Sequence, residues 1–454
     1  MDWNQKLYKY CMYFPVVLTR GQAVPFYLRR LLKSQYMNKI ELEMLQLSKL
    51  RLILAYAKEN VPFYRKALAG RSGSLLEGLE ELQNLPFLTK ADLKREQEGV
   101  RSCERFMLLT PKTTGGSTGM PVTIPKTRSA MAWELAATWR GYSWAGIEIG
   151  DRQARFWGVP FHQKDRWRAR LIDCVANRKR CSAFAFSERD LQVYTQTLKD
   201  FRPRYFYGYV SMLEEYAKFI RRKGVTLPFK LQCIITTSEV LAATQRRLIE
   251  DTFSTKVFNE YGSGELGSIA HECKDGSLHI SAENMIVEVI SGNRLAEPGE
   301  VGELVITELN NYATPLIRYR TGDFASLSRN PCKCGRTLPV ISNLYGRSYD
   351  TIRNSEGKLF HGEFMMYIFE DAQRRNLGIQ AFQVIQENWR SFLIKIVPGG
   401  SYGKATEEFI AHRICDQFDQ DSVVRFEIVG DIPRAASGKM RLIIGMSEDG
   451  SSAQ

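Results

Sequence analysis

The chain has 454 residues, 44% of them hydrophobic, and this length predicts two or three globular domains. Its net charge of +13 favours an anionic partner such as a nucleotide, coenzyme A, an acidic polymer or a membrane surface. No apolar run approaches the roughly 18 residues that span a bilayer, and nine widely spread cysteines do not form a disulfide framework, so we expect a cytoplasmic protein with reduced thiols.

Residues 1–40 combine aromatic side chains with lysine and arginine. Arg29, Arg30 and Lys33 lie on a predicted short helix, so this segment is a basic N-terminal extension. A helix of this kind could lie on anionic lipid, but membrane affinity needs more than one such signal, so weak peripheral association with a membrane is only an alternative at this point. Residues 41–60 place leucine and isoleucine at helical spacing and stop before a Val-Pro pair, which predicts an amphipathic helix.

The stretch TTGGSTGMP, residues 113–121, contains three glycines and no charged side chain. Glycines let the backbone come close to a ligand, and free N–H groups and hydroxyls can then surround phosphate oxygens. A Walker loop would have a lysine after its last glycine, whereas Met120 follows Gly119 here, so a P-loop NTPase is disfavoured. The alternative for this stretch is a flexible linker.

Between about residues 130 and 345, helical patterns alternate with short β-rich runs. The predicted strands cover residues 152–159, 203–210, 231–239, 256–262, 285–290 and 303–307. Strands separated by helices predict an α/β fold with some mixed sheet, in which ligands gather where strands give way to loops. The basic stretch at 164–180 fits either a solvated helix face or an anion site.

The last hundred residues have a different pattern. Residues 381–388 and 390–397 are predicted to pair as strands, with helices near 363–375 and 404–418 and a further strand at 423–429. This is a compact α+β unit of the size of a separate domain.

Three further motifs follow the glycine-rich loop. NEYGSGELG at 259–267 comes directly after a predicted strand, ATPLIRYRTGD at 313–323 ends in an aspartate, and IPRAASGK at 432–439 places a lysine on a glycine-containing loop. Each alone is more often a turn or a solvated side chain than a site. The presence of all these motifs in this order is more specific evidence for a functional site than any one of them alone.

This order resembles the adenylate-forming superfamily, and within it the phenylacetate-CoA ligase family and its CapK-like group. The resemblance runs from about Glu41 to Ile444 and includes NVPFYRKAL, RPRYFYGYVSML, TTSEVL, GELVIT, LYGRSYD and SGKMR. It implies a large multi-subdomain α/β adenylation domain at residues 41–345 and a small mobile α+β lid domain at 346–454. Residues 1–40 are similar to the extension of the CapK-like group.

The resemblance also implies a two-step reaction. A carboxylate attacks the α-phosphate of ATP and pyrophosphate leaves, after which the acyl-adenylate passes its acyl group to an acceptor, commonly coenzyme A. A small-molecule carboxylic acid is thus the expected substrate, ATP and Mg²⁺ are expected to take part, and nucleic acid is not an expected partner.

Roles follow by position within the matching motifs. Lys439 is the implied catalytic lysine and Glu265 the implied Mg²⁺ ligand. The implied phosphate loop is Thr113, Thr114, Gly115, Gly116, Ser117, Thr118 and Gly119. The implied nucleotide site consists of Ser238, Glu239, Asn259, Glu260, Tyr261 and Gly262 around the adenine, Asp323 at the ribose and Arg347 near the phosphates. The implied acyl pocket is Trp157, Tyr207, Gly208 and Ser211, which suits an aryl or short acyl acid, although core packing explains the two aromatic residues equally well.

The acceptor stays open at this point. The position two residues after the arginine of the hinge motif is Tyr349, where the family usually has Asp or Lys. ATP-dependent activation is therefore better supported than transfer to coenzyme A, and an amine or hydroxyl of a surface polysaccharide precursor is the second acceptor. A non-enzymatic basic scaffold is disfavoured, because Asp323 and Lys439 are both retained.

Cysteine and histidine residues indicate a metal site. HECKDGSLH at 271–279 and PCKCGR at 331–336 together supply thiolate and imidazole ligands. Four such ligands favour structural Zn²⁺, and we predict Cys273, His279, Cys332 and Cys334, with His271 as the substitute ligand. Free thiols on loops are the alternative.

Overall fold

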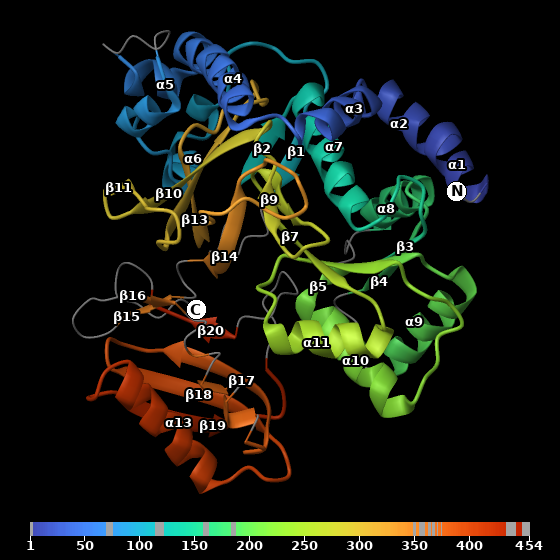
Figure 1. Ribbon diagram of the computed structural model, residues 1–454, viewed down its shortest axis with the longest axis vertical. Coiled ribbons are helices and arrows are strands. Elements are labelled where there is room, and N and C mark those ends of the chain that lie inside the picture. The colour runs from blue at the N-terminus through green and yellow to red at the C-terminus, as the bar shows by residue number, and fades with distance from the viewer. Residues whose placement is uncertain are drawn as a thin grey trace. The chain divides into compact units, whose positions relative to one another are not determined.

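The computed structural model describes residues 3–69, 76–113, 122–157, 163–182, 188–347, 351–353, 359–361, 365, 368–369, 371–373, 375–432 and 442–446. The chain forms two compact units (Figure 1). The first comprises Met1–Thr321 and Ala325–Asn343, and the second comprises Gly322–Phe324 and Leu344–Gln454. Within the described ranges, no helix is long and apolar enough to cross a membrane.

A twelve-stranded sheet has the order β11-β10-β12-β13-β14-β9-β8-β7-β6-β5-β3-β4. Its strands are β3 (Gln153–Trp157), β4 (Arg178–Ser182), β5 (Tyr205–Tyr209), β6 (Cys233–Thr237), β7 (Val257–Ser263), β8 (Gly267–Glu272), β9 (Leu278–Ile280), β10 (Met285–Ser291), β11 (Arg294–Leu295), β12 (Gly302–Glu308), β13 (Tyr319–Leu327) and β14 (Val340–Arg347). Strands β4, β3, β5, β6 and β7 are parallel, whereas β8 and β9 continue antiparallel. The sheet therefore changes direction at β7.

Helices cover both faces of the parallel half (Figure 1). Alternate residues such as Phe206 and Ile234 pack in a core with α9 (Glu188–Phe201), α10 (Val210–Lys223) and α11 (Ala243–Phe253). The intervening residues, such as Tyr207 and Ile235, pack in another core with Tyr142 of α7 (Arg128–Trp144). This alternation is why the short β-rich runs proved to be buried parallel strands.

The N-terminal helices are α1 (Trp3–Leu7), the π-helix η1 (Tyr8–Tyr13), α2 (Phe14–Thr19), α3 (Val24–Ser34), α4 (Lys39–Asn60) and α5 (Pro62–Ala67). Helix α4 begins with a capping box, in which Asn38 and Glu41 each accept the other's backbone N–H, at 2.9 and 3.0 Å. The connection to the sheet contains η2 (Leu79–Asn84), α6 (Lys90–Glu96), η3 (Gln97–Val100) and the hairpin of β1 (Thr110–Thr113) and β2 (Thr123–Lys126).

Residues 3–40 pack closely on the rest of the first unit. Val24 and Leu31 of α3 enter a core with Ala136 of α7. The Ser34 hydroxyl donates to Glu283 Oε1 at 2.5 Å, and the fully buried Arg140 donates to the same oxygen at 2.6 Å. These buried contacts hold the N-terminal helices in place on α7.

The second unit has its own core. Strands β17 (Ile379–Gln386) and β18 (Ser391–Pro398) are antiparallel, while β19 (Val423–Ile428) and β20 (Ile443–Ile444) join them in parallel. The unit also contains α13 (Lys404–Gln417) and the pair β15 (Thr351–Arg353) and β16 (Leu359–His361). Phe369 and Phe382 stack in its core with ring centroids 3.8 Å apart.

The six strands predicted between residues 152 and 307 are present, and so are the helix at 41–60 and the paired strands of the C-terminal unit. The α/β fold class is therefore confirmed. One interpretation needs correction, because the basic stretch at 164–180 is not one helix face. Helix α8 (Gln163–Val175) ends within this stretch. The edge strand β4, which pairs with β3, then begins at Arg178.

Candidate functional site

The carboxyl ends of β5, β6 and β7 lie side by side. In the register of these strands Tyr209 pairs with Thr237, and Thr237 pairs with Glu260. The neighbouring β8 is antiparallel to β7, so the parallel sheet ends at this point. Ligands of open α/β sheets bind outside the carboxyl ends of the strands, so this edge is the candidate site.

Aromatic rings form a wall at the ends of β3 and β5. Trp157 stacks on Tyr207 with centroids 5.7 Å apart, and its ring lies 4.3 Å from that of Tyr209. The Arg155 guanidinium lies 4.8 Å from the Trp157 centroid and 4.9 Å from that of Tyr207. Tyr207 and Tyr209 are buried in the core, so packing accounts for these two rings, whereas Trp157 is half-buried and keeps part of its surface exposed beside Arg155.

Glu260 lies beneath this wall as a buried carboxylate. The Tyr142 hydroxyl donates to its Oε2 at 3.1 Å, and burial raises the pKa of Glu260. His271 Nε2 is 3.7 Å from Glu260 Oε1 and 3.0 Å from the Ser268 hydroxyl. Burial and the nearby Arg140 lower the pKa of His271 to about 3, so the ring is neutral.

Two predicted residues, Ser211 and Glu239, contact each other. Strand β6 ends at Thr237, and Ser238 then adopts a φ of +70°, which turns the chain sharply. The Glu239 carboxylate accepts the Ser211 backbone N–H at 2.7 Å and its hydroxyl at 3.0 Å, at the N-terminus of α10. An acidic group is favourable there because it interacts with the helix dipole.

Packing explains two predicted glycines. A Cβ at Gly208 would lie 2.5 Å from the carbonyl oxygen of Phe156, and a Cβ at Gly262 would lie 2.6 Å from the carbonyl oxygen of Gly267. Both positions therefore need glycine so that neighbouring strands can approach, whatever ligand binds beside them.

Glu265 lies in the turn between β7 and β8 and is 4% exposed. Its Oε1 accepts a hydrogen bond from the Tyr319 hydroxyl at 3.3 Å and lies 3.9 Å from the Lys90 ammonium. Asn259 and Tyr261 both belong to β7, and Tyr261 is buried. Asp323 is a buried residue of β13 that belongs to the second unit.

Lys126, the last residue of β2, is fully buried next to this turn. Its ammonium donates to Glu308 Oε1 of β12 at 2.7 Å and to the Leu266 carbonyl at 3.0 Å, and lies 3.4 Å from Glu134 Oε2 of α7. Burial alone would lower the pKa of Lys126, but the carboxylates of Glu308 and Glu134 outweigh burial and raise it. Lys112 of β1 donates to the other oxygen of Glu134 at 2.5 Å.

These two lysines hold both strands of the β1–β2 hairpin. Thr113 is the last residue of β1 and pairs with Thr123. The rest of the predicted phosphate loop, Thr114, Gly115, Gly116, Ser117, Thr118 and Gly119, lies outside the described residues, as do Lys439 and Tyr349. Arg347 is the last residue of β14, and only its backbone is described.

Four residues near the candidate site were not predicted from the sequence, namely Lys126, Glu134, Arg155 and Tyr209. Tyr209 had a usable signal, since it lies two residues after Tyr207 on a predicted strand and so shares its face. The two residues of the buried ion pair, Lys126 and Glu308, are 182 positions apart and belong to no motif, so the sequence alone gave no signal for their contact.

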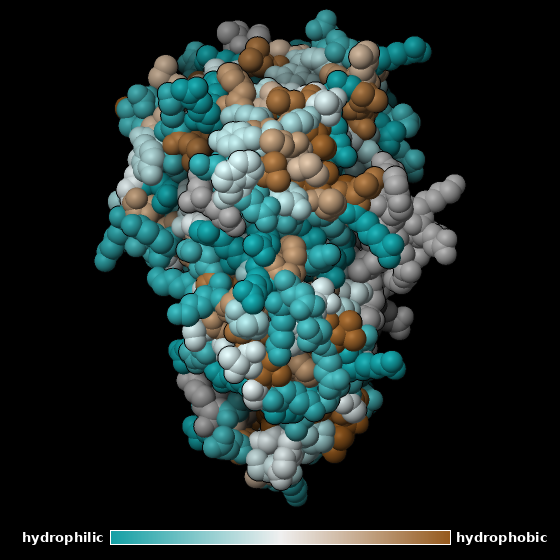
Figure 2. All heavy atoms as spheres, turned by 90° about the vertical axis from the view of Figure 1, so that its right-hand side faces the viewer, coloured by the Kyte–Doolittle hydropathy of each residue, from teal (hydrophilic) through white to brown (hydrophobic). Residues whose placement is uncertain are grey.

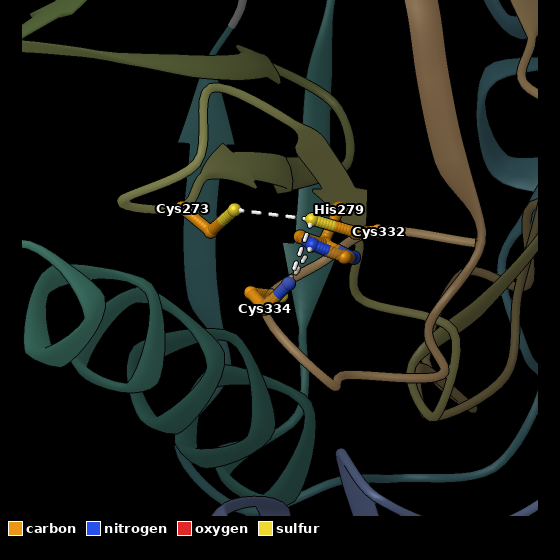
Figure 3. A group of neighbouring side chains, drawn as sticks. All are labelled: Cys273, His279, Cys332 and Cys334. Atoms are coloured by element: carbon orange, nitrogen blue, oxygen red, sulfur yellow. Dashed lines mark hydrogen bonds between the residues drawn. The ribbon is translucent and has the colours of Figure 1, made fainter. Parts of the chain in front are cut away.

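The predicted metal ligands lie together in the first unit (Figure 3). The ligand atoms of Cys273, His279, Cys332 and Cys334 are all within 4.8 Å of one another. Cys273 Sγ is 3.6 Å from Cys332 Sγ, and Cys334 Sγ is 3.3 Å from His279 Nε2. His271 is not part of this group.

The surroundings fix the orientation of the cluster. His279 Nδ1 is 3.1 Å from the Leu338 carbonyl, which leaves Nε2 directed at the sulfurs. The Gln35 side chain accepts hydrogen bonds from Trp144 Nε1 at 2.8 Å and from Arg336 Nε at 3.0 Å. The end of α3 therefore supports the loop that carries the two later cysteines.

The chain is similar to several known proteins. The CapK C-terminal domain family matches residues 352–446. Phenylacetate-coenzyme A ligase of Thermus thermophilus is 28% identical over 324 residues, covering 69% of this chain and 72% of the relative. Protein CapK of Staphylococcus aureus is 24% identical over 400 residues, covering 86% of each chain. The solved structure of 2-hydroxyisobutyryl-CoA ligase in the postadenylation state, in complex with R3-HIB-AMP, has a TM-score of 0.72 at 20% identity and covers 92% of each chain.

We predict that Gly208→Ala destabilises the protein. The added methyl group meets Phe156 of β3, and forcing an extra carbon into a packed core costs about 1–3 kcal/mol of unfolding free energy. The matched control is Gly400→Ala, because no atom lies within 4 Å of a Cβ there. Chemical denaturation measures both variants, and equal stability of the two would contradict the packing role.

Proposed function

We propose that the chain is an adenylate-forming ligase of the branch of phenylacetate-CoA ligase and CapK, and that it activates an aryl or short acyl acid with ATP and transfers the acyl group to coenzyme A. It is therefore an AMP-forming ligase. The observation that carries the proposal is the group of predicted acyl-site and nucleotide-site residues at the carboxyl ends of β5 to β7. Ligand binding at such an edge is typical of the fold class.

The aromatic wall supports the choice of acid. Trp157 is half-buried and packs on Tyr207 and Tyr209, and an aromatic side chain of this kind suits a ring or a short branched chain. Arg155 adds positive charge, which attracts a carboxylate. One relative is named phenylacetate-coenzyme A ligase and another, 2-hydroxyisobutyryl-CoA ligase, was solved in complex with 2-HIB-AMP, and both names agree with an acid of this size.

In the proposed first step the acid carboxylate attacks the α-phosphate, and pyrophosphate leaves with the electrons of the broken P–O bond. Backbone N–H groups and hydroxyls of the loop at 113–119 hold the β- and γ-phosphates. Ser238, Glu239, Asn259, Glu260, Tyr261 and Gly262 line the adenine, Asp323 accepts hydrogen bonds from the ribose hydroxyls, and Arg347 contacts phosphate. Lys439 donates to the oxygens on which negative charge accumulates.

Glu265 is the proposed ligand of Mg²⁺. Its carboxylate is held by the Tyr319 hydroxyl, and a single fixed carboxylate together with substrate phosphates is a common Mg²⁺ ligand set. When bound, the ion would neutralise charge on the phosphates. The Lys90 ammonium, which lies 3.9 Å from Glu265 Oε1, is a second cation in the same region.

The second candidate acceptor is an amine or hydroxyl of a capsular or surface polysaccharide precursor. It is favoured by the match of residues 352–446 to the CapK C-terminal domain and by the similarity to protein CapK along 86% of the chain. The structure of 2-hydroxyisobutyryl-CoA ligase with coenzyme A in the thioesterification state supports coenzyme A as the first candidate.

Incubation with ATP, Mg²⁺ and a panel of aryl, short-chain and long-chain acids tests this function. We expect pyrophosphate release only with an aryl or short acyl acid, and faster AMP release when coenzyme A is added. Acid-dependent pyrophosphate release that coenzyme A does not accelerate would favour the polysaccharide acceptor. Absence of pyrophosphate release with every acid would contradict adenylation.

Lys439→Ala tests the catalytic lysine. We expect acid-dependent exchange of pyrophosphate into ATP to fall by about two to three orders of magnitude, as when one donor to the transition state is removed. ATP binding should change little. Lys404→Ala is the control in the same unit, because the Lys404 side chain is 88% exposed and should leave the exchange rate unchanged. Wild-type exchange by Lys439→Ala would refute the assigned role.

Zn²⁺ is the proposed structural ion at Cys273, His279, Cys332 and Cys334. A tetrahedral ion with bonds of about 2.3 Å to sulfur and about 2.0 Å to nitrogen holds its ligand atoms roughly 3.5–3.8 Å apart. The observed 3.6 Å between two sulfurs and 3.3 Å between sulfur and imidazole fit this geometry. The ion would link the turn after β8 to the loop before β14.

Elemental analysis of protein purified without chelator should find about one zinc per chain. Cys334→Ser should lower both the zinc content and the temperature of unfolding, whereas Cys174→Ser, which changes an exposed cysteine outside the cluster, should alter neither. Less than half an equivalent of zinc in the wild-type protein would rule out the site.

A further inference from the structure

Residues 3–19 form one continuous helical rod of α1, η1 and α2. Its inner side is fixed to the first unit, because Gln5 Nε2 donates to the Ile149 carbonyl at 2.6 Å and Trp139 Nε1 donates to the Tyr13 hydroxyl at 2.7 Å. Val17 is also buried. The rod therefore cannot rotate to hide its other side.

The outer side of the rod is apolar. Trp3 is 79% exposed, Leu7 43%, Tyr10 57% and Leu18 53%. Their spacing of four, three and eight residues places them on one helix face. A row of exposed aromatic and aliphatic side chains on a rigid helix requires a partner surface.

Helix α3 and the residues after it extend this surface. Its exposed apolar side chains are Phe26, Leu32 and Tyr36, and its exposed basic side chains are Arg29, Arg30 and Lys33. Residues 3–38 contain six lysine or arginine residues and no acidic residue. In the view of Figure 2, apolar side chains gather in the upper part of the face with hydrophilic ones around them.

A basic cavity adjoins the rod. It has a volume of about 620 Å³ and is lined by Tyr8 of η1 together with Arg170, Arg178, Lys179 and Arg180. The acidic group among its lining residues, Asp173, is paired with Arg178 and Arg180. Excess positive charge therefore lies next to η1, the segment of the rod that also carries Tyr10 of the apolar row.

We propose that the outer face of the N-terminal helices, residues 3–36, lies on an anionic membrane surface. Tryptophan and tyrosine favour the boundary between headgroups and acyl chains, leucine and phenylalanine insert beyond it, and lysine and arginine reach the lipid phosphates. Each basic side chain near such a surface adds to the attraction between the protein and the anionic lipids. A second copy of this chain fits less well, because two faces of the same positive charge repel each other.

The proposal is independent of the acid and the acceptor. It places the ligase at a lipid surface, where a lipid-linked or membrane-bound acceptor would be concentrated. None of its residues belongs to the candidate site at β5 to β7, so membrane binding and catalysis can be measured separately.

Flotation of the full-length protein with vesicles tests the proposal. We expect binding to phosphatidylcholine vesicles that contain phosphatidylglycerol, weak binding to phosphatidylcholine alone, and release at high salt. Leu7→Glu/Leu18→Glu should weaken binding about tenfold or more, because two leucine side chains that would be buried among the acyl chains are replaced by charged groups. Arg29→Glu/Lys33→Glu should abolish the preference for anionic vesicles.

The matched control is Val193→Glu/Val423→Glu, which introduces the same charges at two positions that are each 56% exposed elsewhere on the surface. It should bind vesicles like the wild type. All variants should keep the wild-type unfolding temperature and AMP formation. If the leucine variant does not fold, Trp3→Ser provides the same comparison, because Trp3 is the most exposed residue of the row.

Three results would overturn the proposal. The first is no enrichment of the wild-type protein on anionic vesicles. The second is equal binding by the leucine variant and the control. The third is a dimer of the wild-type protein that Leu7→Glu/Leu18→Glu dissociates, since the face would then be an interface between copies of the chain.

Discussion

A single buried ammonium, that of Lys126, connects four parts of the first unit. It lies between the β1–β2 hairpin, α7, β12 and the turn that carries Glu265, and it contacts Glu308, Glu134 and the Leu266 carbonyl. A charge with no exposed surface is stable only when opposite charges and hydrogen bonds replace the water it lost. The lysine therefore fixes the hairpin and the turn in relation to each other, and every proposed phosphate and Mg²⁺ contact of this unit depends on that arrangement.

The same principle extends to the N-terminal helices. Arg140 of α7 and Ser34 of α3 share one oxygen of the buried Glu283, and Gln35 supports the loop with Cys332 and Cys334. These contacts fix one side of the helices, and the apolar row on the other side remains exposed. The outer surface proposed for the membrane and the proposed active-site edge of the sheet are built from different residues.

Much of the fold followed from local pattern. Short β-rich runs such as CIITT and YFYGY identified parallel strands that proved to be buried, and the spacing of leucines identified α4. The contact of Lys126 with Glu308 could not be predicted from the sequence. The sequence does not distinguish a buried charged residue from a solvated one, and the two partners are 182 residues apart. The sequence also did not decide which of two histidines completes the metal site. His271 and His279 pair across β8 and β9, and only the side-chain positions show that His279 faces the sulfurs while His271 contacts Ser268.

A double-mutant cycle on Lys126 and Glu308 tests the central claim most directly. The unfolding free energy is measured for Lys126→Met, Glu308→Gln and the double variant. Removing one partner of a buried pair costs about 3–5 kcal/mol because the other charge is left without compensation. We expect the double variant to be more stable than the sum of the single losses predicts, by about 1–3 kcal/mol. Single losses that add to within about 0.5 kcal/mol would show that the pair does not hold these elements together.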